Sequence, residues 1–569
     1  MKGLSSIAPY ITAYHKGMIF GKPEFAFTAN DDTLYNGEPC PGYFMPRSNP
    51  NLYPASNKHV FEIHKQMNQV LAKIAGIDLE RDYDVKSLQS HYQSSPINVA
   101  LVGGATVLPQ LYYEGITTPT EAKEIRCGWG PGVPSDFIYG NIDPKIDDWS
   151  KQATDLYSPN DPYPFQENVV GRITGNNVQD ACALILRTIF YDEIINKMGD
   201  WKDQAAVLMG GGTEFQKPFI RYRIYGDLLN KIPHGEPMKL PTGASYFLGL
   251  TLQKTALGPL GFDTEFIQEN EALYQGFSDE AIKKLKTANL KNLLMMSRKQ
   301  LEDEVGTSVV KGKETMESSN FIYTNGHGGP SSLGLGDVGL WSLGLGLPNG
   351  ILAKLIKYHF VPAKTTLGPG FSLQTHGMYV TRNIENINFG PSVFFLESCG
   401  VGKIDGVYPE RNPVQNFLRS GCNAMYTATT YSNIAGGYNE PKNSMYDIPG
   451  QTLYRYIRTA LDVKSGKYPE EHFGDKIFAD ICEEFEENDG MTTGLAFRQA
   501  RNRYLPEDAD WQLWWSPPLN FIDEEGGVTT YSTSSQSTGY GPYLEHKYVT
   551  FLEFILYGDP AFEPYVPRT

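Results

Sequence analysis

Short runs of apolar residues recur along the chain, and most of them end in a glycine-containing turn. Nearly continuous apolar runs cover residues 97–102, 205–209, 320–324 and 393–396. A strand of a parallel sheet is covered on both faces, so it shows such a run rather than alternating apolar and polar residues. The pattern therefore predicts buried strands over these ranges. Shorter runs predict further strands over residues 137–139, 168–173 and 424–427.

Between the predicted strands, apolar residues recur every three or four positions, which is the spacing of one face of a helix. The segment 58–75 has this spacing and is followed by Gly76, a residue type that commonly ends helices. The segment 179–197 also gathers its apolar residues on one face. We expect helices over both segments, and a shorter helix over residues 412–419.

The alternation of strand, glycine turn and helix is typical of an open α/β sheet. A change in composition near residues 197–201 marks the best candidate boundary between two α/β halves. In open sheets of this kind, ligands and chemistry lie at the carboxyl ends of the strands. The residues that directly follow each apolar run are therefore the candidates for function.

Two of the predicted strands end in residues that can perform nucleophilic chemistry. His327-Gly328 follows the run at 320–324, and Cys399-Gly400 follows the run at 393–396. An imidazole can accept the thiol proton, or as imidazolium hold the thiolate, and can later protonate a leaving amine. Backbone N–H groups of Gly328 and Cys399 are placed to bind a developing oxyanion.

Each member of this pair has a competing interpretation. A buried cysteine is most often inert packing, and a histidine after a strand is most often structural. A second His-Gly pair, His376-Gly377, competes with His327 for the role of base. The run that precedes His376 is less apolar, so His327 ranks first.

Composition and charge narrow the classes of protein. The chain has 569 residues, which is more than one compact core usually holds, so we expect two or more domains or subdomains. The 49 basic and 65 acidic residues give a net charge of −16, which argues against binding to a nucleic-acid backbone. Its six cysteines include no Cys-x-x-Cys pair, so neither a zinc knuckle nor a thioredoxin-like site is indicated.

Other motifs add little. The sequence contains no P-loop, HExxH or GxSxG pattern. Gly334, Gly336 and Gly339 formally match GxGxxG but follow no clear strand, so we interpret them as loop glycines. The first residues show no secretory signal, and no predominantly apolar run reaches the roughly 18 residues of a membrane span. The chain is therefore either cytosolic or a part of a longer exported protein.

The His-Gly and Cys blocks together resemble the caspase-like superfamily of cysteine peptidases, and more specifically the gingipain family. The stretch 399–405 is similar to that family's Cys-x-Thr-Gly-x-apolar-Asp pattern, with Val401 in place of the threonine. The segments 99–104, 170–173 and 556–561 resemble its early strand, its Gly-Arg-apolar element and its closing Gly-Asp-Pro motif. The spacing of 72 residues between His327 and Cys399 is long and indicates an insertion.

The resemblance implies further roles in the site. Glu214, after the run at 205–209, corresponds to the acid that orients the histidine, or else is an ordinary solvated loop glutamate. Glu397 is the alternative orienting acid. Glu440 is the candidate acid for binding a basic P1 side chain, or else an ordinary surface glutamate. Trp341, on the insertion, lines the substrate cleft or simply packs. The resemblance implies structural calcium, for which the acidic loop at 143–161 supplies candidate oxygen ligands. The loop lacks EF-hand spacing, so a solvated charged loop is the better interpretation.

The resemblance also implies the fold, the activity and the setting. We expect a caspase-like open α/β sheet flanked by helices, in two subdomains as in gingipains. The expected parts are an N-terminal segment 1–89, a first subdomain 90–200 and a catalytic subdomain 201–569 with an insertion at about 331–390.

The implied activity is that of a cysteine endopeptidase that acts on proteins or peptides, cleaves after Arg or Lys and requires no cofactor for its chemistry. We expect an extracellular or cell-surface location, with neighbouring domains in a longer protein. The alternative is a catalytically inactive caspase-like domain that serves as a cell-surface or assembly module.

Overall fold

The fold is taken from a computed structural model of the chain. It describes residues 14–15, 17–21, 34–35, 38–39, 52–79, 85–105, 108–113, 133–142, 166–209, 249, 251–268, 275–276, 308–309, 311–329, 332–334, 378–380, 384, 387–405, 407, 409–430, 432, 474–504, 521–522, 528–529 and 549–568. Within some of the short elements, including His327, only the backbone is described.

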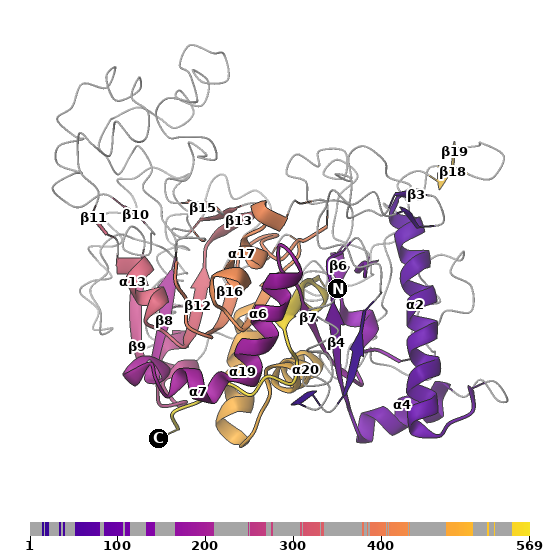
Figure 1. The fold of residues 1–569 in the computed structure, drawn as a ribbon, viewed down its shortest axis with the longest axis horizontal. Coiled ribbons are helices and arrows are strands. Elements are labelled where there is room, and N and C mark those ends of the chain that lie inside the picture. The colour runs from indigo at the N-terminus through magenta and orange to yellow at the C-terminus, as the bar shows by residue number, and fades with distance from the viewer. Residues whose placement is uncertain are drawn as a thin grey trace, which may run out of the picture.

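A nine-stranded, mostly parallel sheet forms the centre of the molecule, in the order β1-β4-β7-β20-β17-β16-β12-β8-β9 (Figure 1). Its strands are β1 (Met18–Phe20), β4 (Asn98–Val102), β7 (Val169–Ile173), β20 (Phe554–Gly558), β17 (Ala424–Ala428), β16 (Val393–Glu397), β12 (Phe321–Asn325), β8 (Gln204–Met209) and β9 (Asp263–Gln268). The α/β fold class predicted from the apolar runs is confirmed. The strands predicted at 97–102, 168–173, 205–209, 320–324, 393–396 and 424–427 are all present to within one or two residues.

Strand β20 comes from the C-terminal part of the chain and lies between β7 and β17. It runs antiparallel to β17, with Phe554 opposite Ala428, and joins β7 where Tyr557 lies opposite Arg172. The strands from β17 to β9 are parallel to one another. The sheet therefore continues across the expected boundary near residue 200, and the division into subdomains stays a prediction.

The strands are buried on both faces, which is why their sequences are continuously apolar. Along β12, for example, Phe321 and Tyr323 belong to one hydrophobic cluster and Ile322 belongs to the other. The first face is covered by α2 (Leu52–Ala75), α19 (Gly474–Glu487) and α20 (Thr493–Tyr504). The second face is covered by α6 (Val178–Ile189), α17 (Pro413–Ser420) and α13 (Lys311–Glu317), with α6 in front of the sheet in Figure 1.

Two helices on the second face begin at asparagine caps. The Asn177 side chain accepts a hydrogen bond from the Asp180 amide at the start of α6, and Asn412 does the same for Gln415 in α17. These side chains satisfy amide groups that the first turn of a helix leaves without partners. The single helix predicted over 179–197 is divided at Phe190 into α6 and α7 (Tyr191–Ile195).

One predicted strand is wrong. Residues 137–139 form a short 3-10 helix, η1 (Phe137–Tyr139), rather than a strand. The Ser135 hydroxyl accepts a hydrogen bond from the Phe137 amide, which favours a turn at this point. All three side chains of η1 are buried, so the apolar run reports burial correctly but not the backbone conformation.

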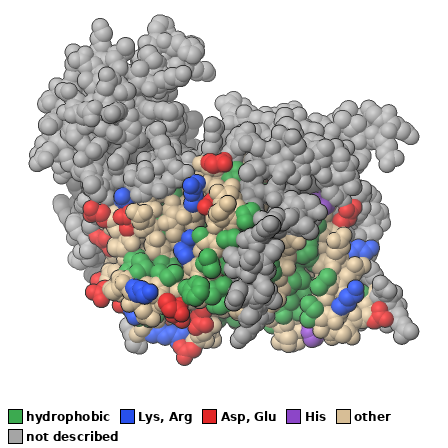
Figure 2. Space-filling model, viewed as in Figure 1, with side chains coloured by type: hydrophobic (Ala, Val, Ile, Leu, Met, Phe, Trp, Pro, Cys, Tyr) green, Lys and Arg blue, Asp and Glu red, His purple; other side chains and the backbone are tan. Residues whose placement is uncertain are grey.

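The remaining elements are short. They are α4 (Val85–Ser94), η3 (Gly199–Asp203), the π-helical turn η5 (Gln253–Leu257), η7 (Pro409–Arg411), and small sheets formed by β2 (Leu34–Tyr35) with β3 (Glu38–Pro39), β5 (Leu111–Tyr113) with β6 (Val133–Ser135), β10 (Gln275–Gly276) with β11 (Ser308–Val309), β18 (Phe521–Ile522) with β19 (Val528–Thr529), and β13 (His327–Gly329) with β14 (Ser332–Gly334) and β15 (Met378–Val380). None of the described helices is long and apolar enough to cross a bilayer. Figure 2 shows acidic and basic side chains interspersed with apolar ones on the face that carries α6.

Candidate active site

The two residues predicted to carry the chemistry follow neighbouring strands at equivalent positions. Strands β12 and β16 are parallel, and Asn325 at the end of β12 lies opposite Glu397 at the end of β16. His327 and Cys399 each come two residues after this pair. The long sequence interval between them therefore does not separate them across the sheet.

Gly328 lies against the backbone of the cysteine turn. A Cβ atom at Gly328 would be 2.6 Å from Val401 Cγ2, 2.7 Å from Ser398 Cβ and 2.8 Å from the Cys399 carbonyl oxygen. Contacts this short are not tolerated, so only glycine allows the two chain segments to approach so closely. The strand that carries His327 is thus packed directly on the turn that carries Cys399.

The turn after Cys399 is fixed to the end of strand β17. Gly400 has a φ of 62°, in the left-handed region that glycine adopts without strain. Its amide donates to the Thr430 carbonyl at 2.6 Å, and the Gly402 amide donates to the Ala428 carbonyl at 2.8 Å. These backbone bonds hold the turn in one position relative to the sheet.

The Cys399 thiol is partly enclosed by protein. Its Sγ donates to the Ser432 carbonyl over 3.5 Å. Burial raises the pKa of Cys399 to about 12, with a smaller opposing effect from the Ser432 carbonyl and a further rise from the negative charge of Glu553. At neutral pH the thiol is therefore protonated unless a cation or a base is brought to it. Nucleophilic chemistry at this position therefore requires a base or a cation close to the thiol.

Glu397, the alternative orienting acid, is fully buried beneath the end of β16. Its Oε2 accepts a hydrogen bond from the Tyr323 hydroxyl at 2.6 Å and from Asn325 Nδ2 at 3.3 Å. Burial, and then the neighbouring Asp475 of α19, raise the pKa of Glu397 well above its usual value. The carboxyl of Glu397 is thus engaged by β12 and α19.

Glu553 is a second buried carboxyl near Cys399, and it was not among the predicted site residues. It precedes β20 and is 0% exposed, and its carbonyl accepts from the Thr429 amide at 3.0 Å. Burial raises its pKa well above the usual value, and the Ser432 and Thr550 hydroxyls oppose that rise. These hydroxyls are close, but within the described part of the chain neither carboxyl oxygen has a hydrogen bond of ordinary geometry.

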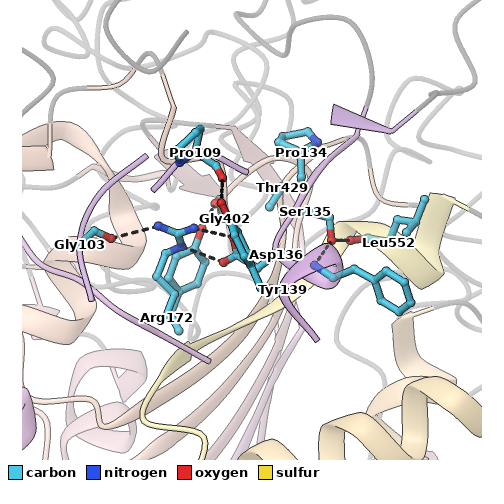
Figure 3. A network of polar contacts seen from close by, with 12 residues as sticks. Gly103, Pro109, Pro134, Ser135, Asp136, Tyr139, Arg172, Gly402, Thr429 and Leu552 are labelled. Atoms are coloured by element: carbon cyan, nitrogen blue, oxygen red, sulfur yellow. Dashed lines mark hydrogen bonds and ion pairs between the residues drawn. The ribbon is translucent and has the colours of Figure 1, made fainter. Parts of the chain in front are cut away.

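A buried ion pair joins two segments from the first part of the chain close to the cysteine turn (Figure 3). Arg172 of β7 binds Asp136 through two parallel contacts, Nε to Oδ2 at 2.7 Å and Nη2 to Oδ1 at 2.5 Å. Its Nη1 donates to the Gly103 carbonyl at 3.1 Å. A bidentate pair of this kind fixes direction as well as distance.

Contacts from the same segment continue to the end of β17 and to the residues before β20, and β20 in turn contacts the cysteine turn (Figure 3). The Thr429 hydroxyl donates to the Pro134 carbonyl at 2.6 Å, and the Ser135 hydroxyl donates to the Leu552 carbonyl at 2.6 Å. The hydroxyl of Tyr557 in β20 donates to the Gly402 carbonyl. The first part of the chain therefore helps to position the turn that carries Cys399.

Several predicted site residues lie outside the described residues. They are Glu214, Trp341, His376 and Glu440, and of His327 only the backbone is described. Their roles stay predictions. The two predicted oxyanion donors, Gly328 and Cys399, are both described, and their backbones are in contact.

The acidic loop proposed to hold calcium, residues 143–161, also lies outside the described residues. Among the residues that are described, no group of three or more His, Cys, Asp or Glu side chains is arranged to hold a metal ion. Cys182, Cys399, Cys422 and Cys482 are free thiols. Of these four, Cys422 and Cys482 are buried, as expected of packing residues.

Two residues of the site region, Asp475 and Glu553, were missed because their neighbours are distant in sequence. Glu553 does leave one signal, since it is a lone carboxylate in the apolar stretch 551–556. A carboxylate is rarely buried in such a stretch, because its burial costs free energy, so its presence marks a candidate functional residue. Asp475 begins a helix that shows no such signal, and only the tertiary structure places it beside Tyr323.

Comparison with known proteins gives a family match. The model of peptidase family C25 matches residues 81–565. Among solved structures, the Arg-specific cysteine proteinase gingipain R is similar at 12% identity, with a TM-score of 0.37 over 84% of this chain and 68% of that chain. A complex of the pro- and mature domains from Porphyromonas gingivalis is similar at 12% identity and a TM-score of 0.37, over 84% and 69% of the two chains. No curated protein matches.

Proposed function

The chain belongs to peptidase family C25 and is a cysteine peptidase, and from this premise we propose that it is an endopeptidase that uses Cys399 and His327. Cys399 is the nucleophile and His327 is the base. The observation that carries the proposal is that His327 and Cys399 each follow a pair of neighbouring strand ends by two residues, and that Gly328 packs on the cysteine turn.

The proposed reaction follows from these positions. The His327 imidazole takes the thiol proton as Cys399 Sγ attacks the scissile carbonyl carbon, and the Gly328 and Cys399 amides bind the oxyanion. The imidazolium then protonates the departing amine, which leaves a thioester on Cys399. A water molecule, deprotonated by His327, hydrolyses the thioester and restores the thiol. Glu214 is proposed to orient the imidazole.

For specificity we propose cleavage after Arg or Lys. Glu440 is the acid proposed to bind the basic side chain, with Trp341 lining the cleft. Glu553 is a second candidate acid for this pocket, because its buried carboxyl lies near Ser432 and Cys399 and, among the described residues, the named groups that shift its pKa are hydroxyls. A basic substrate side chain would supply the missing charge.

The setting of the enzyme is proposed on the same premise. We propose an extracellular or cell-surface location, protein or peptide substrates, and neighbouring domains in a longer protein. Structural calcium is proposed at the acidic loop 143–161, with no metal in the chemistry. Activity that is unchanged after treatment with a calcium chelator, with an unchanged melting temperature, would remove the calcium proposal.

The nucleophile is tested by substitution with a matched control. Cys399→Ala is expected to abolish peptide hydrolysis and labelling by a peptidyl ketone that reacts with thiols. Cys182→Ala removes another partly exposed free thiol, on α6, and should leave both signals intact. Hydrolysis that persists in Cys399→Ala shows that the assignment is wrong.

Specificity is tested with a positional-scanning peptide library, run with and without calcium. Cleavage after Arg or Lys, lost in Glu440→Gln or in Glu553→Gln, assigns the acid that binds the P1 side chain. Cleavage after small or acidic residues removes both assignments.

One observation is also consistent with the second candidate function, a catalytically inactive domain that serves as a binding module. Burial raises the pKa of the Cys399 thiol, which donates a hydrogen bond to the Ser432 carbonyl. An inactive member used as a binding module would show the same features. The two candidates differ in reactivity. In an active enzyme, Cys399 is alkylated at neutral pH, and this reactivity is lost in His327→Ala. In an inactive module, Cys399 is alkylated only at strongly alkaline pH, in the wild type and in His327→Ala alike.

A further inference from the structure

A cluster of buried polar side chains lies directly beneath the paired ends of β12 and β16. It consists of Tyr323 and Asn325 on β12, Glu397 on β16 and Asp475 at the start of α19, all 2% exposed or less. Two members, Asn325 and Glu397, are the last paired residues before His327 and Cys399. The cluster therefore lies directly below the two segments that contain His327 and Cys399 and contacts the strand ends from which they extend.

The hydrogen bonds of the cluster require a proton on a carboxyl group. The Tyr323 hydroxyl contacts both Glu397 Oε2 and Asp475 Oδ1, and it also lies 3.4 Å from Asn325 Nδ2, which can only donate. A tyrosine hydroxyl has one proton and can donate to only one carboxylate. The other carboxyl can make its bond only if it carries a proton and donates to the Tyr323 oxygen.

The charges around the cluster agree with a shared proton. Burial, and then Asp475, raise the pKa of Glu397 well above its usual value. The titratable groups that face Glu397 are Tyr323 from β12, Asp475 from α19 and the Cys399 thiol. Two carboxylates this close cannot both ionise readily in a buried site.

The cluster also holds the two strand ends in register. Asn325 Nδ2 donates to Glu397 Oε2 at 3.3 Å across the strand pair, and the Gly326 amide donates to the Glu397 carbonyl at 3.3 Å. Both bonds act on the residues that precede His327 and Cys399. A shift of one strand end relative to the other would move the base away from the nucleophile.

We propose that Glu397 is a positioning residue that acts as a neutral carboxylic acid and shares one proton with Asp475 through Tyr323. In this way it fixes the register of the β12 and β16 ends, so that His327 and Cys399 follow them side by side. The inference rests on the proposed peptidase function of these two residues. It assigns Glu397 a role different from that of an ionised acid on the imidazole.

Two substitutions at Glu397 separate these roles. Glu397→Gln keeps a neutral side chain that can both accept from Asn325 and donate to Asp475, so we expect kcat of the same order as wild type and unmoved limbs in the pH profile. Glu397→Ala removes the link, so kcat should fall by about 10²-fold with little change in KM, because misplacement of reacting groups by about 1 Å has effects of that size. Rescue by Gln is the outcome that a neutral acid requires.

The opposite pattern overturns the proposal. If Glu397 were an ionised orienting acid, Gln would lower kcat by roughly 10⁴-fold, as in a serine-peptidase triad whose carboxylate becomes an amide. Wild-type kcat in Glu397→Ala would also overturn it, because the link would then have no effect on catalysis.

Variants on the neighbouring elements keep the test open if Glu397→Ala fails to fold. Tyr323→Phe removes only the bridging hydroxyl, and its kcat should fall while KM is kept. Asp480→Asn is the matched control, because Asp480 is a buried carboxyl on the same helix, paired with Lys476 instead of the cluster, and it should leave kcat unchanged. Equal effects in Tyr323→Phe and Asp480→Asn would indicate general destabilisation and contradict the proposal.

Failure of the underlying function would look different. If Cys399→Ala retains hydrolysis, the proposed function is wrong whatever the Glu397 variants do. If Cys399→Ala is inactive and Glu397→Ala has wild-type kcat, only the positioning role is wrong.

Discussion

At the scale of single residues, the site contains carboxyl groups held where they ionise with difficulty. Glu397 and Glu553 both lie fully buried close to Cys399, and burial raises the pKa of each. Their charge, when it forms, also raises the pKa of the thiol. Groups whose protonation is shifted in this way destabilise the fold and are concentrated at functional sites.

Replacement of Glu553 by Gln tests this cost. The folded-state pKa of Glu553 lies above its ordinary value of 4.5, so its contribution to stability is complete below that value and is lost as the pH rises through the folded pKa. Relative to wild type, Glu553→Gln should therefore gain stability as the pH rises, by up to about 1.4 kcal/mol per pH unit within that window. Urea unfolding at pH 4 and pH 8 measures it, and a constant difference would show that Glu553 does not titrate in this range.

Gly328 offers a test of close packing at Cys399, the proposed nucleophile. In Gly328→Ala the new Cβ would meet Val401, Ser398 and the Cys399 carbonyl at 2.6–2.8 Å, so the strand or the turn must shift. We expect kcat to fall by about 10²-fold, because a displacement of about 1 Å is enough for such a loss.

The control for this substitution is Gly76→Ala. Gly76 has a φ of 71° and no atom within 4 Å of an added Cβ, so alanine there strains the backbone without touching the site. It should lower stability, by about 1 kcal/mol, and keep kcat. Retention of full kcat in Gly328→Ala would show that the contact is unimportant for catalysis.

At the scale of elements, helix α17 connects the fold to the cysteine turn through its cap. Asn412 accepts from the Gln415 amide at 3.1 Å and, through Nδ2, donates to the Lys403 carbonyl at 2.7 Å. The same side chain therefore begins a helix and holds the end of the segment that follows Cys399. Asn177 caps α6 in the same way but is exposed.

These two caps give a matched pair of substitutions. Asn177→Ala should cost about 1 kcal/mol of stability, the usual loss for a helix cap, and leave activity unchanged. Asn412→Ala should cost at least as much and also lower kcat, because the bond to Lys403 is lost as well. Thermal unfolding and peptide hydrolysis compare the two, and equal kcat values would show that α17 does not support the turn.

The elements that the sequence predicts well are those buried on both faces. Strands β4, β8, β12 and β16 were predicted because a central strand has apolar residues on each side, whatever its partners are. The segment 137–139 has the same composition but is too short to distinguish a strand from a turn. Strand β20 was noticed only through its Gly-Asp-Pro motif, since its place between β7 and β17 depends on partners more than 100 residues away.

At the scale of the whole molecule, the first part of the chain contacts the region of Cys399 beside the buried pair of Arg172 and Asp136. The pair orients the segment whose Pro134 carbonyl and Ser135 hydroxyl contact Thr429 and Leu552. The placement of Cys399 and His327 directly after buried strands was predictable from the apolar runs. The contacts of Pro134 and Ser135 near this site, and those of α19 beneath it, were not predictable, because pairings over such separations leave no local pattern.

Removal of one partner from this pair should be more damaging than removal of both. Asp136→Ala leaves the Arg172 guanidinium buried without a counter-charge, which costs about 3–5 kcal/mol. The double variant Asp136→Ala with Arg172→Met removes the charge too, and should recover part of that loss. Denaturant unfolding of the single and double variants gives the comparison, and additive losses would contradict the coupling.

The position of β20 has a consequence for the order of assembly. A ribosome releases the chain from its N-terminus, so β7 and β17 are both available before the strand that joins them has been made. The backbone bond between Thr429 and Glu553, close to Cys399, forms only after residue 553 has been made. The region around Cys399 is therefore complete only after β20 has been synthesised, however early its other strands fold.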